Sequence, residues 1–421
     1  MAKNQIISVV YQGIEIGKIG YDANQKKSYF QFNPDFLQQN IYKKLFPYVI
    51  RRTSTVQVFS EFEGETFRGL PPMIADSLPD VFGNLIFKEW LEFTHKNAVD
   101  ISPLEQLTYV GRRGIGALEF VPSKTIDSNI DINIDEITNV VKKVLDVKTS
   151  ITEKKLNDLA LRNIFKLGTS AGGARPKILI SEHKETGTII AGDLEVSDKY
   201  NHYLIKLAID ADAGYSKEKV EFVYYQLATS IGIEMMPSKL IDDKHFATLR
   251  FDRQKGKKQH VLTASGMTGW DFRKPEYSDY DNLFKLAIDL KVPHKDIQQL
   301  FKRMVFNYVF ANIDDHLKNF SFIYNDEKDK WNLAPAYDLT YPLNALIDYI
   351  RVSRAMAING KRTNINLQDF LEIARRYSVK NAQKSIDEVI AVTQEFKELC
   401  KTQKLPEKVV QKIYTDFRLL V

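Results

Sequence analysis

The chain has 421 residues, 44% hydrophobic and 27% charged, which is typical of a soluble globular protein with a large core and excludes a disordered one. The 59 Lys and Arg residues against 54 Asp and Glu give a net charge of +5, too weak a field to indicate nucleic-acid binding. A single cysteine, Cys400, excludes an intrachain disulfide and a multi-cysteine zinc site. The sequence shows no signal peptide and no apolar run of the roughly 18 to 20 residues that cross a bilayer. We therefore expect a cytoplasmic protein with no membrane contact.

The first part of the chain predicts an α+β unit. Residues 5–33 alternate apolar and polar side chains around turn signals, the pattern of a β-meander, and a strand pair is expected within 56–68. An amphipathic helix is expected over 81–94. The Ser-, Asp- and Asn-rich stretch 122–133 is a candidate linker, so we place the first domain at 1–125.

The rest of the chain predicts a small sheet followed by helices. Helical windows are expected over 134–147 and 152–166. The expected strands lie at 177–180, 188–190, 203–207, near 239 and at 247–251, with one helix over 217–230. Beyond residue 280 the helical windows are 296–312, 367–378, 380–398 and 406–418. A sheet lobe at 126–250 followed by a helical lobe at 251–421 indicates an α+β, bilobal protein-kinase-like fold, although many α+β proteins share this order.

The strongest chemical signal is the segment ANIDDHLKNFSF at 311–322, followed by LAPAYDLT at 333–340. Protein kinases space the catalytic Asp and a metal-binding Asn as D-x-x-x-x-N and place a second metal-binding Asp further on. Asp314 and Asn319 have this spacing, and Asp338 stands in the later position. Phosphoryl transfer needs a carboxylate to accept the proton of the attacking hydroxyl group and oxygen ligands for Mg²⁺. Because Asp and Asn also favour turns, an isolated D-x4-N motif is more often a capped turn.

Other parts of a nucleotide site can be sought upstream. The loop LGTSAGGARPK at 167–177 can present backbone N–H groups to phosphate oxygens, although a plain hairpin has the same composition. Lys206 lies among apolar residues of an expected strand, where kinases place a phosphate-binding lysine; a solvent-facing edge lysine is the alternative. Glu221, with Glu218 one turn earlier, is a candidate partner for that lysine. The segment 247–253 falls where a hinge would meet adenine.

Taken together, these segments resemble the HipA family of toxin kinases. The similar strings, in chain order, are GLPPMIADSLPDVFGN, GRRGIGALEFVP, SAGGARPK, RFDR, NIDDHLKNFS and APAYD. Their order and separation make the resemblance far more specific than any one motif. It implies an ATP- and Mg²⁺-dependent serine/threonine protein kinase.

The resemblance assigns roles to individual residues. It implies that Asp314 is the catalytic base, that Asn319 and Asp338 bind Mg²⁺, and that Lys206 binds the nucleotide. It also implies that Ser170 is autophosphorylated, which ejects its loop and silences the enzyme. The further residues implied at the nucleotide site are Ala171, Gly172, Gly173, Ala174, Arg175, Lys177, Leu249, Arg250, Phe251, His316 and Tyr337.

The chain departs from the family pattern at three places. Asp315 follows the base where a small residue is common, and the loop reads RPK instead of QEK. Val223 stands where some members carry the helix glutamate, which leaves the partner of Lys206 open between Glu221 and its neighbours.

The resemblance also implies partners. The family's known substrates are aminoacyl-tRNA synthetases, and its members act beside a small helix-turn-helix antitoxin of the HipB type that binds DNA. No helix-turn-helix is readable in this chain, so any contact with DNA would be indirect. The residues alone leave two other functions open, a small-molecule kinase on the same architecture and a phosphorylation-silenced scaffold that holds an antitoxin. The seven histidines show no paired ligand spacing, which disfavours a metal hydrolase.

Overall fold

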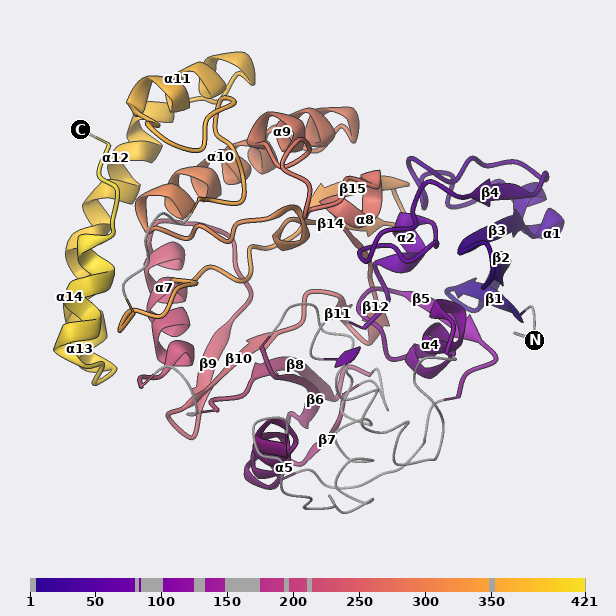
Figure 1. The fold of residues 1–421 in the computed structure, drawn as a ribbon, viewed down its shortest axis with the longest axis horizontal. Helices are drawn as coiled ribbons and strands as arrows, with labels where there is room; N and C mark the ends of the chain where they lie inside the picture. The colour runs from indigo at the N-terminus through magenta and orange to yellow at the C-terminus, as the bar shows by residue number, and fades with distance from the viewer. Residues whose placement is uncertain are drawn as a thin grey trace. The chain divides into compact units, whose positions relative to one another are not determined.

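A computed structural model describes residues 5–79, 83–84, 101–124, 133–147, 175–192, 197–209, 214–347 and 353–420 (Figure 1). The chain divides into two compact units. Unit 1 comprises 1–209, 247–262 and 266–269, and unit 2 comprises 210–246, 263–265 and 270–421. The domain boundaries expected at 125 and 250 stay predictions. No helix in the described ranges has both the length and the apolar character needed to cross a membrane.

Unit 1 begins with a five-stranded antiparallel sheet whose strand order is β4-β3-β2-β1-β5. Its strands are β1 (Gln5–Tyr11), β2 (Ile14–Asp22), β3 (Lys27–Phe32), β4 (Gln57–Phe59) and β5 (Leu118–Val121). The β-meander expected at 5–33 is confirmed. The strand pair expected within 56–68 is wrong, because only β4 forms. Beyond it, the carbonyl of Gly64 accepts hydrogen bonds from the backbone N–H groups of Phe67 and Arg68, which closes a turn in place of a strand.

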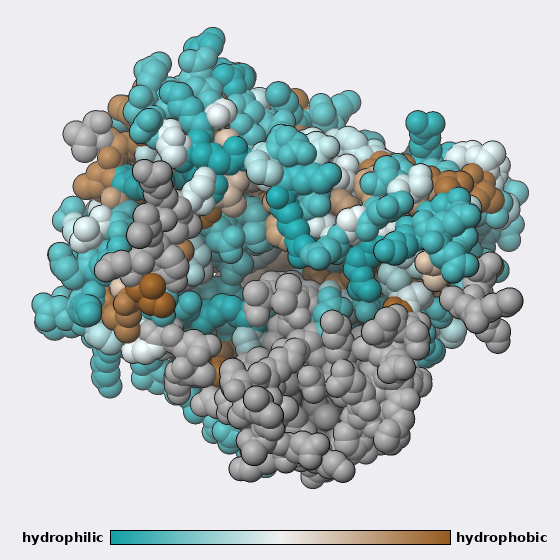
Figure 2. Space-filling model, viewed as in Figure 1, coloured by the Kyte–Doolittle hydropathy of each residue, from teal (hydrophilic) through white to brown (hydrophobic). Residues whose placement is uncertain are grey.

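One face of this sheet is buried and the other carries exposed apolar side chains. Val9, Ile19 and Phe30 are completely buried on the inner face. Three helices belong to this part, namely α1 (Pro34–Gln38), α2 (Pro72–Ala75) and α4 (Pro103–Val110), and α4 packs against β1 and β5. Ile6 and Val58 are exposed on the opposite face, and Figure 2 shows apolar residues gathered over the region of β4.

Four of the five strands expected in the middle of the sequence are neighbours in a second sheet, in the order β7-β6-β8-β10. They are β6 (Lys177–His183), β7 (Ile189–Ala191), β8 (Tyr200–Lys206) and β10 (His245–Leu249). The expected helix over 134–147 is confirmed as α5 (Ile134–Val147). The expected helix at 152–166 lies outside the described residues, as does all of the expected helix at 81–94 except the helical residues 83 and 84.

A short hairpin and one further strand complete the described part of unit 1. Strands β11 (Arg253–Gln254) and β12 (Lys257–Lys258) are joined by Lys255 and Gly256, and β13 (His260–Thr263) follows. Both turn residues have positive φ angles, which is the geometry of a tight two-residue hairpin. Lys255 and Gly256 therefore form the turn of this hairpin, and Lys257 and Lys258 belong to β12.

Unit 2 is mainly helical. Its helices are α7 (Lys217–Ser230), α9 (Tyr280–Asp289), α10 (His294–Val309), α11 (Leu367–Arg376), α12 (Ala382–Val392), α13 (Phe396–Thr402) and α14 (Glu407–Thr415). Helix α8 (Ala264–Thr268) is shared between the units, and strands β9 (Ser238–Ile241), β14 (Ser321–Asn325) and β15 (Lys330–Leu333) also belong to unit 2. Helix α12 packs against α10, and α13 packs against α7 and α14 (Figure 1).

Most expected helix boundaries in unit 2 are confirmed within a few residues. The window expected at 380–398 is wrong as a single helix, because the 3₁₀ turn η3 (Thr393–Glu395) separates α12 from α13. The hydroxyl group of Thr393 donates to the carbonyl of Ile390 (2.7 Å). Such side-chain hydrogen bonding to the preceding turn competes with the helical ladder and bends helices.

Candidate active site

The loop between α10 and β14 brings two of the predicted catalytic residues together. Helix α10 ends as Ala311 adopts a left-handed conformation (φ 53°) that reverses the chain. The side-chain amide of Asn319 donates to the backbone carbonyl of Asp314 (2.9 Å), which also accepts from the backbone N–H of His316 (2.9 Å). This leaves the Oδ1 atom of Asn319 as the acceptor that could face a cation. The D-x4-N spacing therefore forms a closed loop held by its own asparagine.

Asp338 belongs to the same group of side chains. It has a positive φ angle (58°), and its backbone carbonyl accepts from the Nδ2 atom of Asn312 (3.4 Å). Asp314 is exposed as a residue, but the surrounding protein partly desolvates its carboxyl group. That desolvation, with the nearby carboxylates of Asp338 and Asp315, raises the pKa of Asp314, while nearby His316 opposes the rise. Two neighbouring carboxylates and an amide oxygen suit a hard divalent cation such as Mg²⁺.

His316 and Tyr337, predicted at the nucleotide site, support the loop. The hydroxyl group of Tyr337 donates to the carbonyl of Lys318 (2.8 Å) and lies 2.6 Å from the Ser321 hydroxyl. The ring of His316 lies against the ring of Phe272, with their centres 4.8 Å apart. Both side chains thus have contacts within unit 2 that hold the loop, and their predicted contact with a nucleotide stays a prediction.

A buried ion pair beneath the loop was not predicted from the sequence. Asp315, the departure from the family pattern, forms an ion pair with Arg354, and neither side chain is exposed to solvent. The Tyr280 hydroxyl group donates to the same carboxylate (2.7 Å). Burial raises the pKa of Asp315, while Arg354 and the hydrogen bonds oppose the rise. In the sequence, the buried ion pair was indicated only by a second charged residue, Asp315, directly after the proposed base.

In unit 1, two of the predicted nucleotide-binding lysines lie opposite each other. Lys177 on β6 and Lys206 on β8 are partners in the antiparallel register, so their side chains lie on the same face of the sheet. Both are buried. Two ammonium groups on one face of a sheet are suited to binding phosphate oxygens. Arg175 lies two residues before Lys177 and is half-buried.

Two glutamates of α7 are candidates for the predicted partner of Lys206. Glu218 and Glu221 lie one turn apart on α7 in unit 2, and both are buried. Their similar burial leaves both as candidates. Ser170 and the phosphate-loop residues Ala171, Gly172, Gly173 and Ala174 lie outside the described residues.

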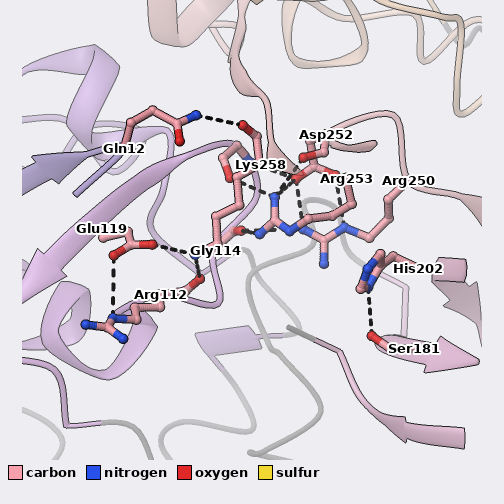
Figure 3. A network of polar contacts seen from close by, with 11 residues as sticks. Gln12, Arg112, Gly114, Glu119, Ser181, His202, Arg250, Asp252, Arg253 and Lys258 are labelled. Carbon is pink, nitrogen blue, oxygen red and sulfur yellow. Dashed lines mark hydrogen bonds and ion pairs between the residues drawn. The ribbon is translucent and has the colours of Figure 1, made fainter. Parts of the chain in front are cut away.

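The expected hinge, Leu249 to Phe251, leads into a network of buried polar contacts in unit 1 (Figure 3). The backbone N–H of Arg250 donates to the carbonyl of His202 (2.8 Å), so this amide is engaged within the sheet. The Arg250 guanidinium group donates twice to Asp252, at 3.0 and 2.8 Å, and Arg253 donates once, at 2.8 Å. The motif RFDR therefore forms a compact arrangement of one carboxylate between two guanidinium groups.

The same cluster holds the segment GRRGIGALEF, which precedes it by more than 130 residues. The backbone N–H of Gly116 donates to Asp252 (2.8 Å), while Arg253 donates to the carbonyls of Gly116 (2.8 Å) and Gly114 (2.8 Å). Burial alone would raise the pKa of Asp252, but Arg250 and Arg253 lower it well below its ordinary value. Sequence reasoning treated the two motifs separately and missed their connection.

A sheet with paired buried lysines and a helical unit with a D-x4-N loop place the chain among the α+β, kinase-like folds. The chain belongs to the HipA family. The model of the HipA-like C-terminal domain matches residues 169–398, and that of the HipA N-terminal domain matches residues 7–121.

Individual relatives agree with this family. The chain is 25% identical over 177 residues to the Sinorhizobium fredii protein named "Putative kinase Y4dM", covering 38% of this chain and 41% of that one. It is 25% identical over 307 residues to "Putative kinase Y4mE" of the same organism, covering 68% and 69%. The chain thus spans less than half the length of Y4dM. The HipA chain in the complex of HipA, HipB and operator DNA from Shewanella oneidensis has the same fold, with a TM-score of 0.63, 15% identity, and 97% and 95% coverage.

Proposed function

We propose that this protein is an ATP- and Mg²⁺-dependent serine/threonine protein kinase and the toxin of a toxin–antitoxin pair. It transfers the γ-phosphoryl group of ATP to a serine or threonine hydroxyl oxygen, and ADP leaves. The observation that carries this proposal is the loop in which Asn319 donates to the carbonyl of Asp314 while Asp338 lies close to the Asp314 carboxylate. A loop that served only as a capped turn would not require Asp338 beside the Asp314 carboxylate.

The residues of unit 2 have distinct roles in this reaction. Asp314 orients the attacking hydroxyl group and accepts its proton. Asn319 Oδ1 and the Asp338 carboxylate would hold Mg²⁺, which neutralises negative charge on the phosphates when bound. The hydrogen bonds of Asn319 and Tyr337 keep the loop in one conformation, and such preorganisation is where most of the catalytic effect in phosphoryl transfer lies.

The residues of unit 1 would bind the nucleotide. Lys177 and Lys206 share one face of their sheet, where two ammonium groups favour phosphate oxygens. The phosphate loop would comprise residues 171–177 and so end at Lys177, and Leu249 to Phe251 would meet the adenine. Because the Arg250 amide is already bound to His202, the hinge contacts would come from the neighbouring backbone groups.

The finer parts of the proposal concern partners and regulation. The solved Shewanella oneidensis protein is in a complex with HipB and operator DNA, which supports a small DNA-binding antitoxin as the partner and indirect contact with DNA. An aminoacyl-tRNA synthetase is the proposed protein substrate. Ser170, seven residues before Lys177, is the proposed autophosphorylation site.

Labelled ATP, Mg²⁺ and a cell extract test the proposal. The wild-type protein should label one discrete protein, or itself at Ser170, and Asp314→Asn should abolish the labelling. Autophosphorylation should add about 80 daltons to the intact mass. Labelled products that pass an ultrafiltration membrane would identify a small-molecule kinase instead. Equal labelling by wild type and Asp314→Asn would refute the assignment of the base.

A further inference from the structure

The buried pair Asp315–Arg354 is placed where it can control the catalytic loop. Asp315 follows the proposed base directly, so fixing its side chain also fixes the backbone on one side of Asp314. The Nη2 atom of Arg354 lies 2.5 Å from Asp315 Oδ2, and the Tyr280 hydroxyl donates to the same oxygen (2.7 Å). The backbone N–H of Met356 donates to Oδ1 (3.3 Å). Two separate parts of unit 2, Tyr280 and the segment 354–356, thus converge on one carboxylate.

The segment that carries Arg354 lies along the catalytic loop. The backbone N–H of Ala355 donates to the carbonyl of Ile313 (2.7 Å), the residue before Asp314. The Nε atom of Arg354 donates to the carbonyl of Met356 (2.6 Å), which holds the guanidinium group towards Asp315. Asp314 therefore lies between two residues that are both attached to residues 354–356.

A chain of buried hydrogen bonds continues from this carboxylate to the proposed metal ligand. The Tyr280 hydroxyl accepts from Asn307 (3.1 Å), and Asn307 Oδ1 accepts from the side chain of Asn312 (2.9 Å). Asn312 also donates to the carbonyl of Asp338 (3.4 Å). Tyr280, Asn307 and Asn312 are all buried. Hydrogen bonds thus connect the Asp315 carboxylate to the backbone of Asp338 through Tyr280, and to the backbone beside Asp314 through residues 354–356.

A contribution to the free energy of folding does not by itself explain why this ion pair is buried. Removing two charges from water costs several kcal/mol for each ion, and replacing a buried pair with apolar residues of similar volume is often neutral or stabilising. Buried polar networks with all members satisfied specify one arrangement of the groups around them. Both oxygens of the Asp315 carboxylate accept hydrogen bonds, from Tyr280 and from the segment 354–356, so the carboxylate itself meets this condition, although Arg354 Nη1 has no hydrogen-bond partner among the described residues.

We propose that Arg354 and Asp315 are positioning residues that hold the Asp314 carboxylate in register with Asp338. The proposal rests on the proposed phosphoryl transfer at Asp314. The pair makes no contact with substrate in this role; it acts through the backbone of the loop. Asp315, an apparent departure from the family pattern, is accounted for because Arg354 supplies its counter-charge.

The test compares Arg354→Met, Arg354→Lys, Asp315→Asn and the double variant Asp315→Asn/Arg354→Met. Arg375→Met is the matched control, since Arg375 forms a surface pair with Glu372 and its side chain is 77% exposed. Full-length proteins are assayed by the rate of autophosphorylation, where kcat denotes the first-order rate constant at saturating ATP and KM the ATP concentration that gives half of that rate. We expect Arg354→Met to lower kcat about 100-fold, the scale of a 1 Å misplacement of reacting groups, with KM for ATP unchanged.

The double variant separates positioning from folding. It removes both buried charges, so its melting temperature should recover relative to the single variants, while its kcat stays low. Recovery of kcat together with stability would overturn the proposal, as would a folded Arg354→Met protein with wild-type kcat. If Arg354→Met does not fold, Arg354→Lys and the double variant decide by the same criteria.

Hydrogen exchange gives a readout that does not depend on activity. Peptides covering 311–320 and 334–340 should exchange faster in the double variant, while peptides of unit 1 and the Arg375→Met control stay unchanged. Unchanged exchange in both peptides would overturn the positioning role. If the wild-type protein transfers no phosphate but these peptides respond, the proposed function fails and the positioning of the loop stands.

Discussion

Asp252 offers the sharpest test of how unit 1 is built. The side chains of Arg250, Asp252 and Arg253 are only 3%, 4% and 0% exposed. Replacing Asp252 with Asn removes the negative charge and leaves two guanidinium groups buried together. Breaking a buried ion pair by removing one partner costs about 3 to 5 kcal/mol, and here one carboxylate is paired with both arginines. We expect Asp252→Asn to destabilise unit 1 by at least about 3 kcal/mol.

The assay must report on unit 1 by itself. Native-state hydrogen exchange of peptides covering 111–121 and 249–262 follows both sides of the cluster that Figure 3 shows. A loss of about 3 kcal/mol corresponds to a roughly 100-fold larger open population. Asp198→Asn is the matched control, since Asp198 is an exposed aspartate of the same unit, and such surface changes stay within about 0.5 kcal/mol. Equal protection in the two variants would refute the reasoning.

The pH dependence gives an independent check of the same carboxylate. The arginines hold the pKa of Asp252 well below its ordinary value in the folded protein. A depressed pKa contributes stability that is fully present above the unfolded value of about 3.9 and is lost as the pH falls below it. The difference in stability between wild type and Asp252→Asn should therefore be constant above about pH 5 and shrink in more acidic solution. A difference that grows on acidification would contradict the assignment.

Three further predictions concern single positions. Burial lowers the pKa of His260 to about 3, although a backbone hydrogen bond with Leu45 opposes the shift. The folded protein therefore keeps this ring neutral, and its stability falls once the pH drops below the unfolded pKa of about 6.5. In urea titrations, acidification from pH 7 to 5 should lower the free energy of unfolding of wild type by about 2 kcal/mol more than that of His260→Gln. Lys206→Met should weaken binding of a fluorescent ATP analogue about tenfold or more, the scale of one charged hydrogen bond, whereas Lys184→Met at an exposed position should not. Gly116→Ala should lower the melting temperature more than Gly187→Ala, because both have positive φ but only at Gly116 would the new methyl group meet backbone atoms, at 3.2 and 3.3 Å.

Local patterns predicted the elements of the fold well where sequence-local forces decide. The alternation at 5–33 forms β1 to β3, and the periodicity at 134–147 and 217–230 gives α5 and α7 with the same boundaries. The 380–398 window failed as one helix because the 3₁₀ turn η3 intervenes at Thr393–Glu395, and hydrophobic periodicity does not distinguish such a turn from a continuing α-helix. The prediction of a second strand after β4 was wrong because the apolar residues there alternate as in a strand, whereas the backbone turns at Gly64.

The candidate site was predictable only where chemistry fixes the spacing. Asp314 and Asn319 are five residues apart because one loop must present both groups, so the motif was readable. The partners of Asp315 and Asp252 are set by tertiary contacts: Arg354 is 39 residues from Asp315, and Gly116 is 136 residues from Asp252. No spacing rule connects such pairs, and the charge of the residue alone does not show that it is buried.

The two buried aspartates have the same relation to the predicted functional groups. Asp315 directly follows the proposed base, and Asp252 directly follows the proposed hinge at 249–251. Each binds arginine and a backbone N–H, and each attaches its motif to a distant segment, residues 354–356 for Asp315 and residues 114–116 for Asp252. A residue adjacent to a functional atom moves with it, so a charge buried at that position resists displacement of the site. The cost of burying these carboxylates is therefore best explained by positional accuracy, in unit 1 and unit 2 alike.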